Sequence, residues 1–134
     1  MKKIFLVSAF LLTATSASAE VSNTVTLRSV SVENGTMKFG YQVGGGCQNH
    51  TSVVSAKIVR TSKVLAKYVT RKAIISVADV TDAPDFCEAL LYPTGEANLK
   101  EVVEAAIAKA GLTKEDANIT EIALPKVDAY SVLR

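Results

Sequence analysis

The chain has 134 residues, a formal net charge of +2 and a hydrophobic fraction of 49%, but only 6% of its residues are aromatic. This length predicts one domain with a core of its own. The small net charge argues against a nucleic-acid-binding protein. The scarcity of aromatic rings argues against the stacking platforms of many carbohydrate and single-strand binders.

The first 19 residues have the pattern of a secretory signal peptide. Lys2 and Lys3 precede an apolar run from Ile4 to Leu12, and the small residues Ala17-Ser18-Ala19 form a cleavage motif. No later apolar run is long enough to span a bilayer. We therefore expect a bacterial Sec-type signal at 1–19 and a single exported domain at 20–134, in the periplasm or secreted.

A β-hairpin is predicted over residues 24–43. A run rich in β-branched residues, Thr24 to Glu33, leads into Asn34-Gly35, and apolar and polar residues then alternate up to Val43. Asn-Gly suits the positive φ angles of a two-residue type I′ turn, which would pair Val32 with Met37 and Val30 with Phe39. Since Val25 and Leu27 are out of phase with Val30, we also predict a bulge near Arg28-Ser29.

Two or three further strands are expected between Val53 and Val80, because Val, Ile, Thr and Tyr are frequent there. The candidate runs are Val53–Arg60, Val64–Thr70 and Lys72–Val77. This part of the chain is also basic. Its cations could bind an envelope protein or an anionic surface, or they could form a solvated sheet face that resists aggregation. They are Lys57, Arg60, Lys63, Lys67, Arg71 and Lys72.

The C-terminal part combines strands with a helix. Residues Cys87–Tyr92 predict a strand closed by Pro93-Thr94-Gly95, and residues 98–110 predict an amphipathic helix capped by Asn98 and stopped by Gly111. A short helical turn at 113–116, a strand at 119–124 and an edge strand at 127–133 would follow. The fold class is therefore α+β, an antiparallel sheet (the hairpin plus further strands) with one amphipathic helix packed on it.

Cys47 and Cys87 are the two thiols, and in an exported protein an even pair most simply forms one disulfide. The alternative is a metal site for zinc or copper in which both thiols stay reduced and act with His50, which is separated from Cys47 by two residues. Asp85 or Glu88 would complete that site.

Two short segments, Gly45-Gly46-Cys47-Gln48-Asn49-His50 and Asp85-Phe86-Cys87-Glu88-Ala89, resemble an uncharacterised group of small exported bacterial β-rich domains. These domains share a Gly-Cys-x-x-His segment after one strand and an Asp-x-Cys-Glu-Ala segment before another. The resemblance implies that the two cysteines pair across neighbouring strands, with His50 and Asp85 bracing the bridge. It implies no activity.

No specific catalytic motif occurs in the sequence, which has one histidine. We therefore expect a non-catalytic exported domain that binds a protein or an envelope component, without a cofactor, and that uses Cys47 and Cys87 as a structural disulfide. Candidate functional neighbours are His50, Asp85 and Glu88. The alternatives are a metal-binding protein using Cys47, His50 and Cys87, and a small envelope hydrolase using a pair of carboxylates.

Overall fold

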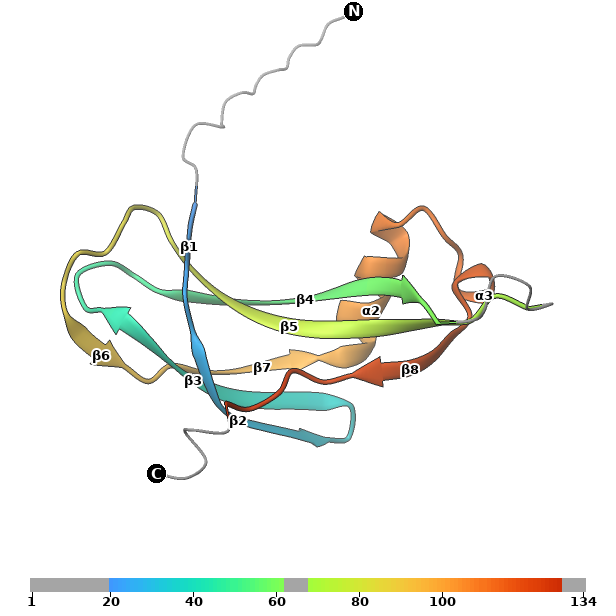
Figure 1. Cartoon of the computed structure of the whole chain (residues 1–134), viewed down its shortest axis with the longest axis horizontal. Coiled ribbons are helices and arrows are strands. Elements are labelled where there is room, and N and C mark those ends of the chain that lie inside the picture. The colour runs from blue at the N-terminus through green and yellow to red at the C-terminus, as the bar shows by residue number, and fades with distance from the viewer. Residues whose placement is uncertain (1–19, 62–67, 129–134) are drawn as a thin grey trace, which may run out of the picture.

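The computed structural model describes residues 20–61 and 68–128. The predicted signal peptide therefore lies outside the described residues, as do Lys63 and Lys67. The described part is a β-rich α+β structure in which two four-stranded sheets contribute to one core, together with one main helix (Figure 1). This agrees in outline with the predicted fold class, although the strands form two sheets rather than one.

The first sheet is built on the long strand β5 (Arg71–Thr81). Strand β4 (Thr51–Arg60) pairs with β5 along its whole length, antiparallel, while β1 (Val21–Asn23) pairs antiparallel with one end of its other edge. Strand β8 (Ile119–Ala123) pairs with the opposite end of that edge, but in parallel. The predicted antiparallel pairing is confirmed for the other strand pairs of the described residues, and β8 is the exception. Its parallel pairing follows a long crossover through two helices.

The second sheet is built on β3 (Thr36–Gly45), which is flanked by β2 (Thr26–Glu33) on one side and by β7 (Thr94–Asn98) and β6 (Ala89–Leu91) on the other. The predicted hairpin is confirmed: Val32 pairs with Met37 and Val30 with Phe39. The register shifts between Leu27 and Ser29, which confirms the bulge. Asn34 and Gly35 have φ angles of 53° and 78°, as a type I′ turn requires.

Several predicted strand boundaries are wrong. Residues 68–70 are not in a strand, and residues 64–67 of the same predicted strand lie outside the described part. The predicted closing turn at 93–95 instead leads directly into β7, where Thr94 pairs with Gly40 and Gly95 with Phe39. Residues 127–128 are not in a strand either, and the rest of that predicted edge strand is not described. Each of these errors concerns long-range pairing, which local composition does not encode.

The helical predictions at 98–110 and 113–116 are confirmed. Helix α2 (Leu99–Lys109) begins after Asn98, whose side chain accepts a hydrogen bond from the backbone N–H of Glu101. Gly111 follows with φ 75°, the left-handed conformation usual just beyond a helix end. The short α3 (Lys114–Ala117) is capped by Thr113 in the same way as α2.

One cluster of buried residues joins the two sheets and α2. Strand β3 contributes the inward-facing Met37, Phe39, Tyr41 and Val43, and β5 contributes Ala73 and Ile75. Helix α2 adds Leu99, Val103 and Ile107 to this cluster. At one end of the molecule, the end of β3, the start of β4 and the end of β5 come together, and this end carries the two cysteines (Figure 1). We call it the disulfide end.

Candidate functional site

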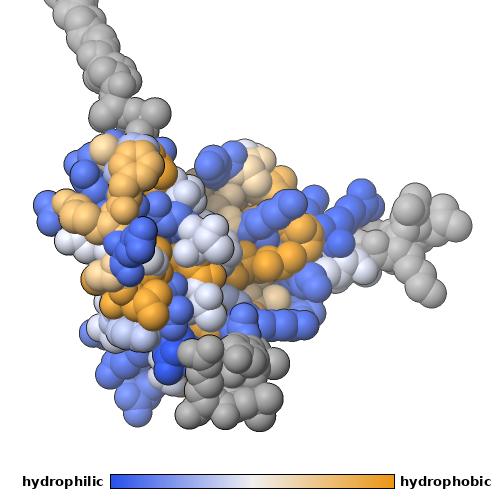
Figure 2. All heavy atoms as spheres, turned by 60° about the vertical axis from the view of Figure 1, so that its left-hand side comes forward, coloured by the Kyte–Doolittle hydropathy of each residue, from blue (hydrophilic) through white to orange (hydrophobic). Residues whose placement is uncertain are grey.

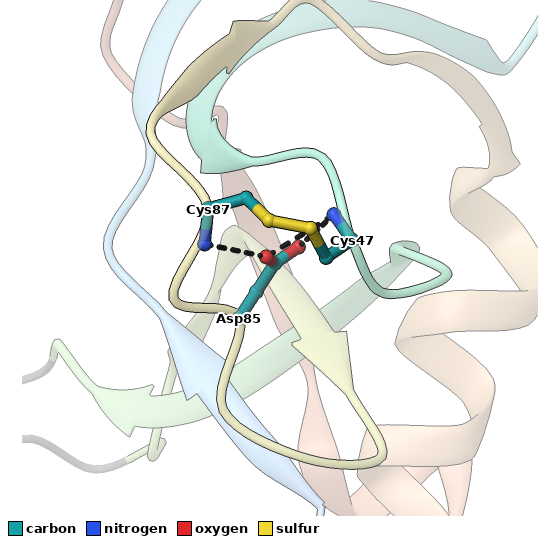
Figure 3. Close-up of side chains that lie close together, drawn as sticks. All are labelled: Cys47, Asp85 and Cys87. Atoms are coloured by element: carbon teal, nitrogen blue, oxygen red, sulfur yellow. Dashed lines mark hydrogen bonds between the residues drawn. A yellow bond between two sulfur atoms is a disulfide. The ribbon is translucent and has the colours of Figure 1, made fainter.

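Two loops meet at the disulfide end. One connects β3 to β4 and contains Cys47 and His50, and the other follows β5 and contains Asp85 and Cys87. Cys47 and Cys87 form a disulfide with a Cα–Cα distance of 5.8 Å, which confirms the predicted pairing (Figure 3). The bridge connects residues 40 positions apart, so it closes a large loop that includes both β4 and β5.

Asp85 fixes the backbone of both loops. Its carboxylate accepts hydrogen bonds from the backbone N–H groups of Gly46, Cys47 and Gln48 at 3.0, 3.1 and 3.0 Å, and from Cys87 at 3.2 Å. Figure 3 shows the carboxylate between the two cysteine nitrogens, beside the disulfide. Consecutive N–H groups that converge in this way form an anion-binding nest, here filled by a side chain of the same protein.

His50 bridges two carboxylates. Its Nδ1 lies 2.6 Å from Asp79 Oδ2, and its Nε2 lies 2.8 Å from Asp85 Oδ2. Because an ionised carboxylate can only accept, both hydrogen bonds form together when each ring nitrogen carries a proton, that is, when the ring is an imidazolium. The side chains of His50, Asp79 and Asp85 are 6%, 0% and 1% exposed. The hydrogen bond to Asp79 and then that to Asp85 raise the pKa of His50, against the opposing effect of burial.

Asp79 connects this pair to the core. Its carboxylate accepts hydrogen bonds from the Tyr41 hydroxyl at 2.6 Å and from the Asn23 amide at 2.8 Å. Burial alone would raise the pKa of Asp79, but the hydrogen bonds from Tyr41, His50 and Asn23 together lower it. Burial and the bond to Asp79 raise the pKa of the Tyr41 phenol. Similarly, the bonds from His50 and the nest outweigh burial and lower the pKa of Asp85.

Asn23, Tyr41 and Asp79 also belong to this network, and they were not predicted from the sequence. A signal was present, because Ala73, Ile75, Val77, Asp79 and Thr81 alternate along β5 and share one face of the strand. An acid in phase with core residues needs buried partners. Ending the predicted strand at Val77 hid this phase.

The hydrogen bonds within this network limit the reactions in which its side chains can take part. Both nitrogens of His50 are held by carboxylates, so neither is free to act as a general base in this arrangement. Among the described residues, Cys47, Asp85 and Cys87 have potential metal-ligating atoms within 4.8 Å of one another, but the two sulfurs form the disulfide. His50 and Glu88 are not part of that group, and Glu88 is exposed.

An exposed phenylalanine lies between the two most firmly held residues of the site. Phe86 is 87% exposed, although its neighbours are Asp85, which is anchored by the nest, and Cys87, which is anchored by the disulfide. Leu90 and Tyr92 nearby are each 58% exposed. Figure 2, which brings the disulfide end forward, shows hydrophobic side chains gathered there. The hydrogen bonds of Asp85 and the disulfide thus hold in place a loop that presents an apolar surface.

The predicted basic segment is only partly a free surface. Lys57 and Arg60 are exposed on β4. Arg71 is half-buried and donates hydrogen bonds to the backbone carbonyls of Asp116 and Ala117, at 2.6 and 3.3 Å. It therefore connects the start of β5 to α3, and this use needs no external partner.

No protein-family model, curated protein or solved structure matches the chain. Within residues 20–61 and 68–128, no helix combines the length and apolar character needed to cross a membrane.

Proposed function

We propose that this protein is a non-catalytic exported binding module that holds a protein partner through Phe86. The observation that carries the proposal is the contrast between the 87% exposure of Phe86 and the fixed backbone on both sides of it. Exposed apolar side chains that gather in one patch, as Phe86 does with Leu90 and Tyr92, mark interaction surfaces. A backbone that is already ordered adds little entropy cost on binding.

The surroundings of Phe86 suggest the chemistry of the partner. Asp82 and Glu88 are exposed and lie within four residues of Phe86. Aromatic anchors typically enter apolar pockets at the centre of an interface, and charged groups line the rim. The complementary surface is therefore an apolar pocket bordered by lysine or arginine side chains on a protein of the same compartment.

The disulfide and the position of helix α2 are both consistent with this role. The disulfide is compatible with an oxidising compartment, in line with the predicted signal peptide. Helix α2 packs on the sheets as a structural cover, which its buried Leu99, Val103 and Ile107 support.

The metal-binding alternative would require reduction of the disulfide and release of His50 from two carboxylates. The hydrolase alternative would require a carboxylate pair other than Asp79 and Asp85, since these hold His50.

The experiment uses site-specific photo-crosslinking in an exporting host. A photoreactive phenylalanine analogue replaces Phe86 in one variant and Val32, which is 43% exposed on the hairpin, in the control. We expect one discrete crosslinked protein from position 86 and none from position 32. That protein is then purified and its affinity is measured for the wild type, Phe86→Ser and Val32→Ser.

Loss of an aromatic anchor should weaken binding by about 30-fold or more, while Val32→Ser should bind as the wild type does. Added salt should weaken wild-type binding, because rim charges are screened. The proposal fails if position 86 gives no discrete crosslink, or if the purified partner binds Phe86→Ser and wild type equally well. Equal unfolding midpoints of the three proteins show that the comparison concerns binding alone.

A further inference from the structure

The outer face of the β3 sheet has a trough at its centre. Ser29, Gly40 and Thr94 are opposite one another on β2, β3 and β7. They share the face turned away from the core, because a Cβ added at Gly40 would lie 3.0 Å from Ser29 Oγ and 3.7 Å from Thr94 Cγ2. Two adjoining hollows of about 490 and 180 Å³ share Ser29 and Thr94 in their walls.

One end of the trough holds a braced arginine. Arg28, which the β-bulge places beside this face, stacks over the Tyr92 ring at 5.3 Å from its centroid. Its Nη1 also donates a hydrogen bond to Gln42 Oε1 at 3.4 Å. In the part of the chain that the structure describes, no carboxylate forms an ion pair with Arg28. The guanidinium therefore keeps further N–H donors for a ligand, in the fork geometry that suits a carboxylate.

Among the charged groups of the described residues that line the trough, Arg28 is the one cation without a paired acid. At the other end, Lys38 and Glu96 are direct cross-strand neighbours, so their opposite charges offset each other. Arg28 then gives the trough a net positive charge. Between the two ends, the wall offers the hydroxyl groups of Ser29, Ser31 and Thr94. A complementary ligand is anionic at one end and rich in hydroxyl groups along its length.

We propose that this trough binds a carboxylate-bearing saccharide. Arg28 holds the carboxylate, and the serine and threonine hydroxyls bind the sugar hydroxyls above Gly40. The scarcity of aromatic residues does not conflict with this site, because the polar wall and the guanidinium recognise the ligand without a stacking platform. The trough does not include Phe86, although the Tyr92 ring that supports Arg28 also belongs to the apolar surface near Phe86. Saccharide binding does not depend on the protein-binding role of Phe86.

The experiment is an NMR titration of the exported, disulfide-bonded protein with a glucuronate-containing tetrasaccharide. Uncharged cellotetraose and acetate are the comparison ligands. We expect amide shifts concentrated in residues 28–31, 38–42 and 94–96, and binding about tenfold or more tighter than that of either comparison ligand. Arg28→Gln should weaken binding of the acidic tetrasaccharide by a similar factor. The matched control is Arg60→Gln, an exposed arginine on the other sheet, which should change nothing.

Shifts that are absent or lie outside the trough would overturn the proposal. Equal binding of cellotetraose would remove the role of Arg28, and equal binding of acetate would show a simple anion site without saccharide recognition. Phe86→Ser should bind the saccharide as the wild type does, so the two binding roles can fail independently.

Discussion

At the scale of single residues, His50 organises the disulfide end. It donates to Asp79 through Nδ1 and to Asp85 through Nε2. The imidazolium compensates the charge of two nearly unexposed carboxylates, which would otherwise repel each other. The His50 cation therefore connects Asp79, on β5, to Asp85. Asp85 is held by the backbone nest and lies in the loop that carries Phe86.

This arrangement predicts a stability maximum in mildly acidic solution. The pKa of His50 is raised in the folded protein, so its contribution is fully present below about pH 6.5 and is lost as the pH rises through the folded pKa. The pKa values of Asp79 and Asp85 are lowered, so their contribution is present above about pH 4 and is lost as the pH falls through their folded values. Urea unfolding measured between pH 2 and pH 9 tests this.

His50→Asn should be less stable than the wild type and should lack the loss of stability on the alkaline side. Asp82→Asn, which removes an exposed carboxylate outside the network, should keep the wild-type pH profile. A wild-type profile that is flat from pH 4 to pH 9 would show that His50 does not carry the charge assigned to it.

At the scale of elements, the end of β3 is shaped by the side chains packed against it. Gly45 has φ 153°, and a Cβ there would lie 2.5 Å from Asp85 Oδ2 and 2.6 Å from His50 Nε2. Only a residue without a side chain lets the strand pass this close to the ion pair. Gly44, one position earlier, has only Ala89 O near its Cβ position, at 4.0 Å. Adjacent glycines thus have different structural roles.

We expect Gly45→Ala to destabilise the protein by about 1–3 kcal/mol, because the methyl group must displace Asp85 or His50. Gly44→Ala is the matched control and should change stability by less than about 0.5 kcal/mol. Chemical denaturation of both variants gives the comparison. Equal stabilities for the two variants would mean that the network tolerates a side chain at Gly45.

At the scale of the whole molecule, three kinds of interaction join the two sheets. The buried cluster is shared by β3, β5 and α2. The Tyr41 hydroxyl, on β3, donates to Asp79, on β5, at 2.6 Å. The disulfide adds a covalent connection between the loops that leave these strands. The core should therefore hold the fold together without the disulfide, at lower stability.

Reduction of the disulfide should lower the free energy of unfolding by roughly 4 kcal/mol, the loop-entropy value for a closed loop of this length. The measurement is guanidinium unfolding with and without a phosphine reductant. The double variant Cys47→Ser, Cys87→Ser should match the reduced wild type and should not respond to the reductant. If reductant leaves the unfolding midpoint of the wild type unchanged while alkylation shows free thiols, the disulfide does not contribute to stability.

Local sequence patterns were sufficient to predict several structural elements of this protein. Asn34-Gly35 and the alternation after it set the hairpin and its register, and the phase change between Leu27 and Val30 located the bulge. The turn φ angles and the β-bulge depend on neighbouring residues only, so one sequence is enough to predict them. The same holds for the helix after Asn98, where the cap and the apolar stripe are local. An even pair of cysteines predicted the disulfide.

Only the tertiary structure showed which residues contact one another. The sequence does not show that Asp79 faces His50, that Tyr41 reaches Asp79, or that β8 joins β5 in parallel, because these residues are far apart in the chain. The trough likewise needs Ser29, Gly40 and Thr94 from three strands in one register. Such contacts depend on how the sheets assemble, and local propensity carries little information about that assembly. The sequence contains these residues, but only the fold brings them together into sites.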